Sequence, residues 1–348
     1  MSTGDVRSEE LSAKGHAVAD ALGRHAPRSG DPQLAGTIAA AVSAKLGQPD
    51  ARVGRFTALR RLGGGALGVV YAGFDPDLGR EVAIKILGRR SDIGKRRLWR
   101  EALALSGIAH PNVLAVYEVG WFDGTTYIAT ELAPHGTLGD WLATPRPIAS
   151  ILELFSQVGR GLAAVHRRGL VHRDVKPANL FMGKDGRVLV GDFGLVARAG
   201  AQRREAPVSA EPSQAELTVD GTAIGTPGYA APEQWAGRPV DARADQYAFA
   251  VSLARALWGP DVSLVDVVSG TSMPATRSGE PVPDDLVGVL RRALTESPDD
   301  RYPEMLDLVA ALEDVGDRLL ARRARRLGAW LLALPVLGTL AWFLAAMR

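Results

Sequence analysis

Short stretches of alternating apolar and polar residues dominate the chain between residues 55 and 132. Many of the apolar positions hold valine, isoleucine or aromatic residues, which is typical of half-buried strands. Turn-forming residues separate some of these stretches, as at Asp75, Pro76 and Gly79. A helix is expected over residues 96–108. The pattern predicts strands over residues 56–59, 69–72, 81–87, 115–121 and 125–132.

After residue 136 the pattern becomes mainly helical, interrupted by loops, up to about residue 317. One expected loop, residues 199–223, is rich in Ala, Pro, Ser, Gln and Glu. Strands therefore concentrate in the first part of the folded region and helices in the second, which predicts an α+β fold. The length of 348 residues fits about two domains, or one large domain with appendages.

Residues 1–54 are expected to form an N-terminal extension with one short helix. Asp31 suits the N-cap of this helix and Pro32 its first position. Apolar residues follow at helical spacing, at Leu34, Ile38, Val42 and Leu46. We interpret this segment as a docking helix or a partly ordered tail rather than a separate functional module. The polar N-terminus lacks the features of a secretory signal.

Residues 327–347 contain no charged residue, and as a helix they would be about 31 Å long, which matches a bilayer core. Trp330 and Trp342 lie near the two ends, where interfacial aromatic residues occur. The segment is predicted to be a transmembrane helix that contacts membrane lipid. The alternative is a core helix, but a wholly apolar helix is hard to bury after a complete soluble domain.

Five arginines lie in the basic juxtamembrane segment 317–326, just before the predicted helix, and only Arg348 follows the helix. The positive-inside rule predicts a single-pass membrane protein whose larger part lies in the cytoplasm. The net charge of +2 reflects this local cluster, because the first 317 residues carry −4. Nucleic acid is therefore not an expected partner.

The absence of cysteine excludes disulfides, Cys-ligated zinc and a cysteine nucleophile.

A glycine-rich segment follows the first predicted strand. Gly63, Gly65 and Gly68 fit the pattern G-x-G-x-x-G-x-V, in which backbone without Cβ atoms can approach a phosphate closely. A strand follows rather than a helix, so we expect a hairpin over phosphates and not a dinucleotide-binding turn. A plain glycine-rich turn is the simpler alternative.

Lys85 lies between apolar residues of a later predicted strand. Such a lysine either faces solvent or provides a cation inside a cleft that binds phosphates. The second case requires an acidic partner, for which Glu101 in the following helix is the candidate. Without that role, Glu101 would be a solvated residue paired with Arg97.

A third motif, H-R-D-V-K-P-A-N, contains a carboxylate, a lysine two residues later and an amide five residues after the carboxylate. Asp174 can accept a proton from a hydroxyl, Lys176 can neutralise a transferring phosphoryl group, and Asn179 can ligate a cation. Asp192 begins the motif D-F-G thirteen residues after Asn179. Its carboxylate is a hard oxygen ligand suited to Mg²⁺.

In this order the motifs resemble those of the protein kinase family, from about residue 55 to about residue 314. The resemblance implies a bilobal fold over residues 55–316, with lobes at about 55–132 and 133–316. It implies that Asp174 is the catalytic base, assisted by Lys176, Lys85 and Glu101, and that Asn179 and Asp192 bind metal. The implied ATP-binding residues are Leu62, Gly63, Gly64, Gly65, Ala66, Leu67, Gly68, Val69, Val70, Ala83, Lys85, Thr130, Glu131 and Ala133.

Residues 226–233 resemble the end of a kinase activation segment. The resemblance implies an ion pair between Glu233 and Arg301, and a bracing contact from Asp245 to the catalytic loop. Arg173 implies control by phosphorylation of the segment. The candidate sites, which could also be ordinary loop threonines, are Thr218 and Thr222.

The form K-P-x-N resembles serine/threonine kinases, and the style of several segments resembles their bacterial, often membrane-tethered branch. The implied function is transfer of the γ-phosphate of ATP, with Mg²⁺, to serine or threonine hydroxyls of proteins, together with autophosphorylation. Two other functions stay open. A catalytically silent pseudokinase scaffold is disfavoured by the intact motifs, and a small-molecule phosphotransferase by the peptide-receiving segment 226–233.

Overall fold

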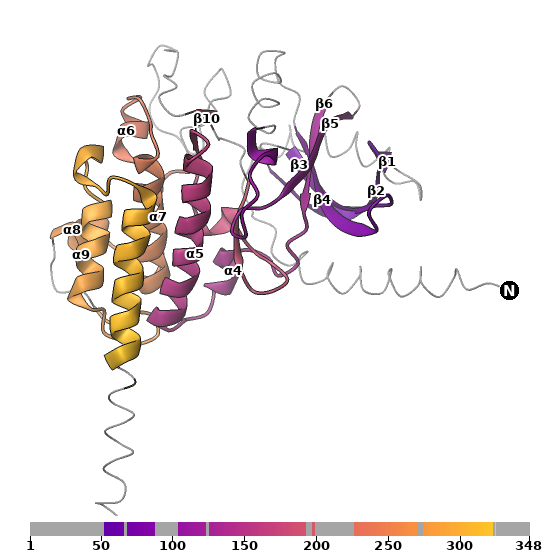
Figure 1. Ribbon diagram of the computed structural model, residues 1–348. Coiled ribbons are helices and arrows are strands. Elements are labelled where there is room, and N and C mark those ends of the chain that lie inside the picture. Colours follow the sequence, from indigo (N-terminus) through magenta and orange to yellow (C-terminus); the bar gives the residue numbers. More distant parts are fainter. Residues whose placement is uncertain are drawn as a thin grey trace, which may run out of the picture.

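The computed structural model describes residues 52–65, 68–87, 104–122, 125–192, 197–198, 226–269, 274–322 and 324. Figure 1 shows a curled sheet at one end of the molecule and a group of helices at the other. The predicted separation of a strand-rich lobe from a helical lobe is therefore confirmed. The expected N-terminal helix, the loop 199–223 and the expected membrane segment 327–347 lie outside the described residues.

The strand-rich lobe is built on a six-stranded antiparallel sheet with the order β1-β2-β3-β4-β6-β5. All five predicted strands are present, and a two-residue edge strand, β1, adds to them. One face of the sheet packs into an apolar core that includes Phe56, Val69, Ile84 and Tyr127. The strands are β1 (Arg52–Val53), β2 (Phe56–Gly65), β3 (Gly68–Asp75), β4 (Arg80–Leu87), β5 (Val116–Phe122) and β6 (Thr125–Glu131).

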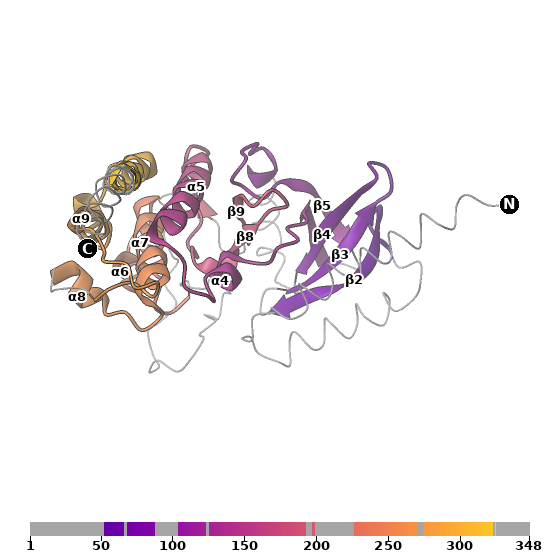
Figure 2. The same ribbon diagram turned by 90° about the horizontal axis from the view of Figure 1, so that it is seen from below.

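The helical lobe is built around α5 and α7, which lie side by side in Figures 1 and 2. Phe155 and Phe249 meet between them edge to face, with ring centroids 5.3 Å apart. A further helix covers residues 305–322. The labelled helices are α4 (Leu138–Trp141), α5 (Ile148–His166), α6 (Pro232–Trp235), α7 (Arg243–Trp258), α8 (Leu264–Ser269) and α9 (Asp284–Ala293).

Four short strands in the second lobe are a difference from the sequence prediction, which expected helices and loops there. Each has only two or three residues, too few to show an alternating pattern. They form two small antiparallel pairs that carry the loops of the candidate site. The strands are β7 (Leu170–Val171), β8 (Leu180–Met182), β9 (Val188–Val190) and β10 (Ala197–Arg198).

Of the helix predicted over residues 96–108, the structure describes the end, where residues 104–106 are helical. Leu105 and Ile108 pack against Val113 and against Ala164 of α5.

The helix 305–322 continues past the expected domain boundary at 316, and Arg318 forms ion pairs with Asp285 and Asp314.

Among the described helices, α5 alone is long and apolar enough to cross a membrane. However, 67% of its most apolar stretch is buried inside the protein. Its buried residues include Phe155, Val158 and Leu162, which belong to the main core of the helical lobe. Its apolar character therefore serves packing within this lobe.

Gly161 of α5 packs directly against the segment that precedes β5. A Cβ atom at this position would lie 2.3 Å from the carbonyl oxygen of Asn112. We expect Gly161→Ala to lower the free energy of unfolding by about 1–3 kcal/mol, because overpacking outweighs the gain in helix propensity. Denaturant unfolding followed by circular dichroism measures this change.

Gly288 of α9 provides the matched control, because no atom lies within 4 Å of a Cβ built there. Gly288→Ala should raise the free energy of unfolding by up to about 1 kcal/mol. Equal effects of the two substitutions would contradict the packing account of Gly161.

Candidate active site

Cross-strand pairing places several predicted ATP-binding residues on one face of the sheet. Val70 of β3 pairs with Lys85 of β4, and Ala83 of β4 pairs with Thr130 of β6. Directly paired residues share a face, as do residues two apart on one strand. These four side chains therefore face the same way, and all are partly exposed.

Val69 is an exception among the predicted ATP-binding residues. It lies on the opposite face of the sheet, fully buried in the core of the strand-rich lobe. Its side chain therefore packs in this core rather than on the face that carries Lys85. Strand alternation is the physical reason, because neighbouring residues point to opposite sides.

The glycine-rich segment forms the turn between β2 and β3, where Gly64 pairs with Val69 and Gly65 with Gly68. Gly68 has φ +145°, and a Cβ atom there would lie 2.1 Å from the carbonyl oxygen of Ile86. Only glycine fits this position. Leu62 falls at an irregularity in the pairing, between Arg61 and Gly63. The predicted residues Ala66 and Leu67 lie outside the described residues.

An ion pair between Lys85 and Asp192 connects the two lobes. Both side chains are partly exposed, at 20% and 33%. Burial acts to raise the pKa of Asp192, but the charge and hydrogen bond of Lys85 outweigh it, so this pKa lies below its ordinary value. The predicted partner Glu101 lies outside the described residues.

Asp174 lies at the centre of a network formed by the loop between β7 and β8. The Lys176 ammonium donates to Asp174 Oδ2 at 2.8 Å. The amide nitrogen of Asn179 donates to the same oxygen and to the Asp174 carbonyl, each at 2.8 Å. Short elements hold this loop, since Asn179 closes the 3₁₀ turn Pro177–Asn179 and its carbonyl accepts from Gly191.

Thr226 completes this network, and it was not among the site residues predicted from the sequence. Its hydroxyl donates to Asp174 Oδ1 at 2.7 Å, and its backbone N–H donates to the same atom at 3.1 Å. Lys176 also donates to the Thr226 hydroxyl. The motif that contains Thr226 was visible in the sequence, but its contact with Asp174 depends on a chain separation of 52 residues.

Asp174 is an ionised carboxylate in this arrangement. Burial acts to raise its pKa, but Lys176, Thr226 and Asn179 together keep the pKa below the ordinary value of aspartate. A carboxylate with a depressed pKa is a weak base. It can accept a hydrogen bond and orient a hydroxyl group, which suits a residue that positions an acceptor.

We expect Thr226→Val to lower the rate of phosphoryl transfer by about 10- to 100-fold, because Asp174 loses a hydrogen bond to a charged group. Initial rates at saturating ATP measure this effect, and Thr226→Ser should restore most of the rate because it keeps the hydroxyl. Equal rates for the valine variant and the wild type would contradict the role of this contact.

The buried carboxylate of Asp245 in α7 supports the loop from below, as the sequence predicts. Its two oxygens accept from the backbone N–H groups of His172 and Arg173, each at 2.8 Å. His166 Nε2 lies 2.7 Å from Asp245 Oδ2. Burial acts to raise the pKa of Asp245, but these partners hold it below its ordinary value. Arg173 has φ +67°, so this support fixes a strained backbone position.

The predicted ion pair between Glu233 and Arg301 is also present. Arg301 is fully buried, and two of its nitrogens donate to the two Glu233 oxygens at 2.7 and 2.9 Å. Its remaining donors reach backbone carbonyls of Arg243, Thr295 and Glu296. This pair ties the end of the segment 226–233 to the helical lobe.

The residues present fit a magnesium ion. The Asn179 amide nitrogen donates both of its hydrogen bonds to Asp174, which leaves the amide oxygen available as a ligand. Asp192 supplies a carboxylate. Over the described ranges, no group of three or more His, Asp or Glu side chains is arranged to hold a metal. Mg²⁺ suits this pair, because it is commonly bound by one or two protein groups together with substrate phosphates.

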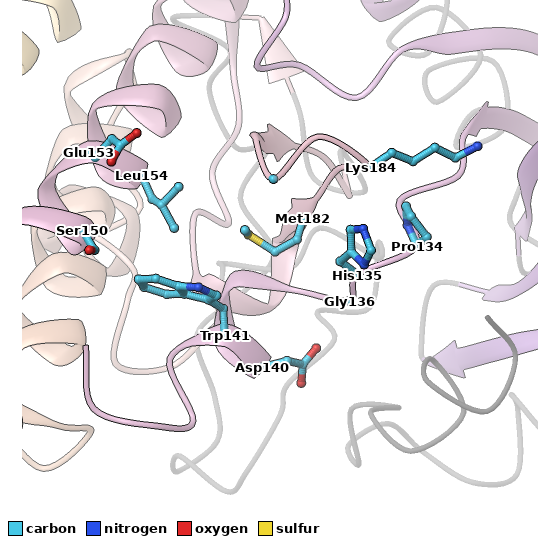
Figure 3. Close-up of a pocket in the computed structure, with 11 residues that line it drawn as sticks. Pro134, His135, Gly136, Asp140, Trp141, Ser150, Glu153, Leu154, Met182 and Lys184 are labelled. Carbon is cyan, nitrogen blue, oxygen red and sulfur yellow. The ribbon is translucent and has the colours of Figure 1, made fainter. Parts of the chain in front are cut away.

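A cavity of about 820 Å³ lies in the second lobe, where its lining includes Pro134, Trp141 and Met182. Figure 3 shows Trp141, Leu154 and Met182 grouped along it, with Asp140 and Glu153 nearby. None of the site residues predicted from the sequence lines it.

The predicted phosphorylation sites Thr218 and Thr222 lie outside the described residues.

Comparison with known proteins identifies the family. Residues 56–271 match the protein kinase domain. Over 279 residues the chain is 34% identical to serine/threonine-protein kinase PknF of Mycobacterium tuberculosis, covering 74% of this chain and 55% of that protein. It is 33% identical to Pkn1 of Myxococcus xanthus and 30% identical to PrkC of Bacillus subtilis. These alignments cover 75% and 78% of this chain, and 38% and 42% of the relatives.

The chain thus spans about half the length, or less, of these curated relatives. The match nevertheless includes every motif described above from the glycine-rich turn to Asp245. The chain belongs to the protein kinase family, in which ATP with Mg²⁺ is the phosphate donor.

Proposed function

We propose that this chain is a serine/threonine protein kinase that transfers the γ-phosphate of ATP to hydroxyl groups of proteins. The observation that carries the proposal is the network in which Asp174 contacts Lys176, Asn179 and Thr226 at once. It joins the expected catalytic carboxylate to the segment 226–233, which is suited to receive a peptide. The names of the curated relatives support the same activity.

On the nucleotide side, the partly exposed face with Val70, Ala83 and Thr130 would contact the adenine ring. Backbone groups of residues 131–133, where β6 ends, would hydrogen-bond its edge. Lys85 would bind the phosphates, and its ion pair with Asp192 keeps the ammonium group near the metal ligands. When bound, Mg²⁺ supplies charge neutralisation on the phosphates, held by Asn179 and Asp192.

On the acceptor side, Asp174 would accept a hydrogen bond from the substrate hydroxyl and aim its oxygen at the γ-phosphorus. The proton passes to the carboxylate as the new oxygen–phosphorus bond forms and the bond to ADP breaks. Lys176, 2.8 Å from Asp174, would offset charge on the transferring group. Positioning and electrostatics therefore provide most of the rate enhancement.

Autophosphorylation at Thr218 or Thr222 is part of the proposal, with Arg173 as the group that would receive the new phosphate charge. Incubation of phosphatase-treated chain with ATP and Mg²⁺, followed by phosphopeptide mapping, tests it. We expect phosphate on one of these threonines. A chain that binds ATP but gains no phosphate and modifies no protein would instead support the pseudokinase alternative.

We further propose that residues 327–347 tether the kinase domain to the cytoplasmic face of a membrane. The support is the uncharged length of this segment and the arginines before it. The full chain should sediment with membranes and resist extraction by high salt, whereas a chain that ends at residue 326 should stay soluble. Full chain recovered in the soluble fraction would refute the tether.

A further inference from the structure

Arg255 lies against the segment 226–233, which we propose receives the protein substrate. It belongs to the last turns of α7, and its guanidinium carbon lies 4.3 Å from the centre of the Tyr229 ring. A Cβ atom built on Gly228 would be 2.8 Å from Arg255 Nη2 and 3.5 Å from Nη1. The guanidinium therefore lies beside the backbone of Gly228 and over the face of Tyr229.

The charge of Arg255 has no acidic counterpart in the part of the chain that the structure describes. Its Nε atom is buried and makes no hydrogen bond with any described residue. Glu233, the acid at the end of the segment 226–233, is paired with Arg301. Arg277, near the C-terminal end of the same helix, directs its guanidinium to the carbonyls of Leu142 and Ala143.

The position of Arg255 relative to Asp174 sets its reach along a bound peptide. Thr226 hydrogen-bonds to Asp174 at 2.7 Å, and Gly228 follows only two residues later. Two residues of chain span at most about 7 Å. A substrate whose hydroxyl lies at Asp174 would therefore bring a side chain two or three residues away within reach of Arg255.

We propose that Arg255 recognises an acidic side chain of the protein substrate, two or three residues from the phosphorylated serine or threonine. A guanidinium group binds a carboxylate through two parallel hydrogen bonds, and stacking on Tyr229 restricts its orientation. This inference rests on the proposed kinase function and adds a substrate class to it. A substrate with a basic residue at the same position would face repulsion from Arg255.

The test uses full-length chain and a set of peptides with one threonine, in which a single aspartate is moved through each position within four residues of it. We expect kcat/KM to be on the order of five- to tenfold higher with aspartate at the favoured position than with alanine there. The variant Arg255→Glu should reverse this preference in favour of lysine. Arg255→Gln should abolish it and serves as a second variant.

Arg52→Glu is the matched control, because it makes the same charge change at an exposed residue of β1 in the other lobe. It should leave the peptide preference unchanged. If Arg255 only supported Tyr229, its variants would lower the rates of all peptides by the same factor, which would overturn the inference. Equal rates of the wild type on all peptides would also overturn it and leave the kinase function intact. Wild-type chain that phosphorylates no peptide or protein would overturn both.

Discussion

Replacing Asp174 by asparagine should lower the rate of phosphoryl transfer by about 10²- to 10⁴-fold. Asparagine has nearly the same shape, but its amide cannot take the proton of the substrate hydroxyl. It also removes the negative charge with which Lys176 pairs at 2.8 Å. The ionised state of Asp174, with its depressed pKa, is therefore lost without a large change in packing.

The measurement is transfer of labelled phosphate from ATP to a protein acceptor, at equal concentrations of wild type and variant. Thermal unfolding and nucleotide binding should stay close to wild type. Asp185→Asn is a suitable control, because Asp185 is an exposed acid of the turn between β8 and β9. An Asp174→Asn variant with wild-type activity would refute the assignment of this residue as the catalytic base.

Substitution of Arg301 by alanine should lower the free energy of unfolding by about 3–5 kcal/mol. Arg301 is fully buried and donates five hydrogen bonds, two of them to Glu233. Its removal leaves the buried Glu233 carboxylate without a counter-charge and three backbone carbonyls without a donor. Lysine should not restore the stability, because its three donors lack the geometry of the guanidinium fork.

Chemical denaturation of the wild type and of Arg301→Ala measures the difference. Arg318→Ala removes a more exposed arginine, 49% accessible and paired with Asp314, and should change the stability by no more than about 1 kcal/mol. Similar effects of the two substitutions would contradict the view that burial makes the Arg301 pair important. The Arg301 variant should also lose activity, because the segment 226–233 loses its attachment.

The strand-rich lobe was predictable because its strands are long enough to show alternation. The same alternation explains why Val70 and Lys85 share a face and why Val69, within the glycine-rich motif, packs into the core. The motifs carrying Asp174, Asn179 and Asp192 were visible as fixed spacings. Their meeting in space follows from β7, β8 and β9, which have only two or three residues each and leave no periodic pattern.

Contacts over long chain separations were the least predictable part of the site. Thr226 approaches Asp174 from 52 residues away, and Lys85 pairs with Asp192 from 107 residues away. Neither distance follows from local composition or periodicity. Arg255 had no sequence motif to mark it, and only its position against Gly228 and Tyr229 indicates a role.

Identification of the residues that receive phosphate tests most directly whether this chain is a serine/threonine protein kinase. Purified full-length chain would be incubated with a protein acceptor, Mg²⁺ and ATP labelled at the γ-phosphate, and the labelled residues identified by mass spectrometry. We expect label on serine or threonine of the acceptor, and no label when Mg²⁺ is omitted. Folded chain that binds ATP and transfers no phosphate to any protein side chain would contradict this function.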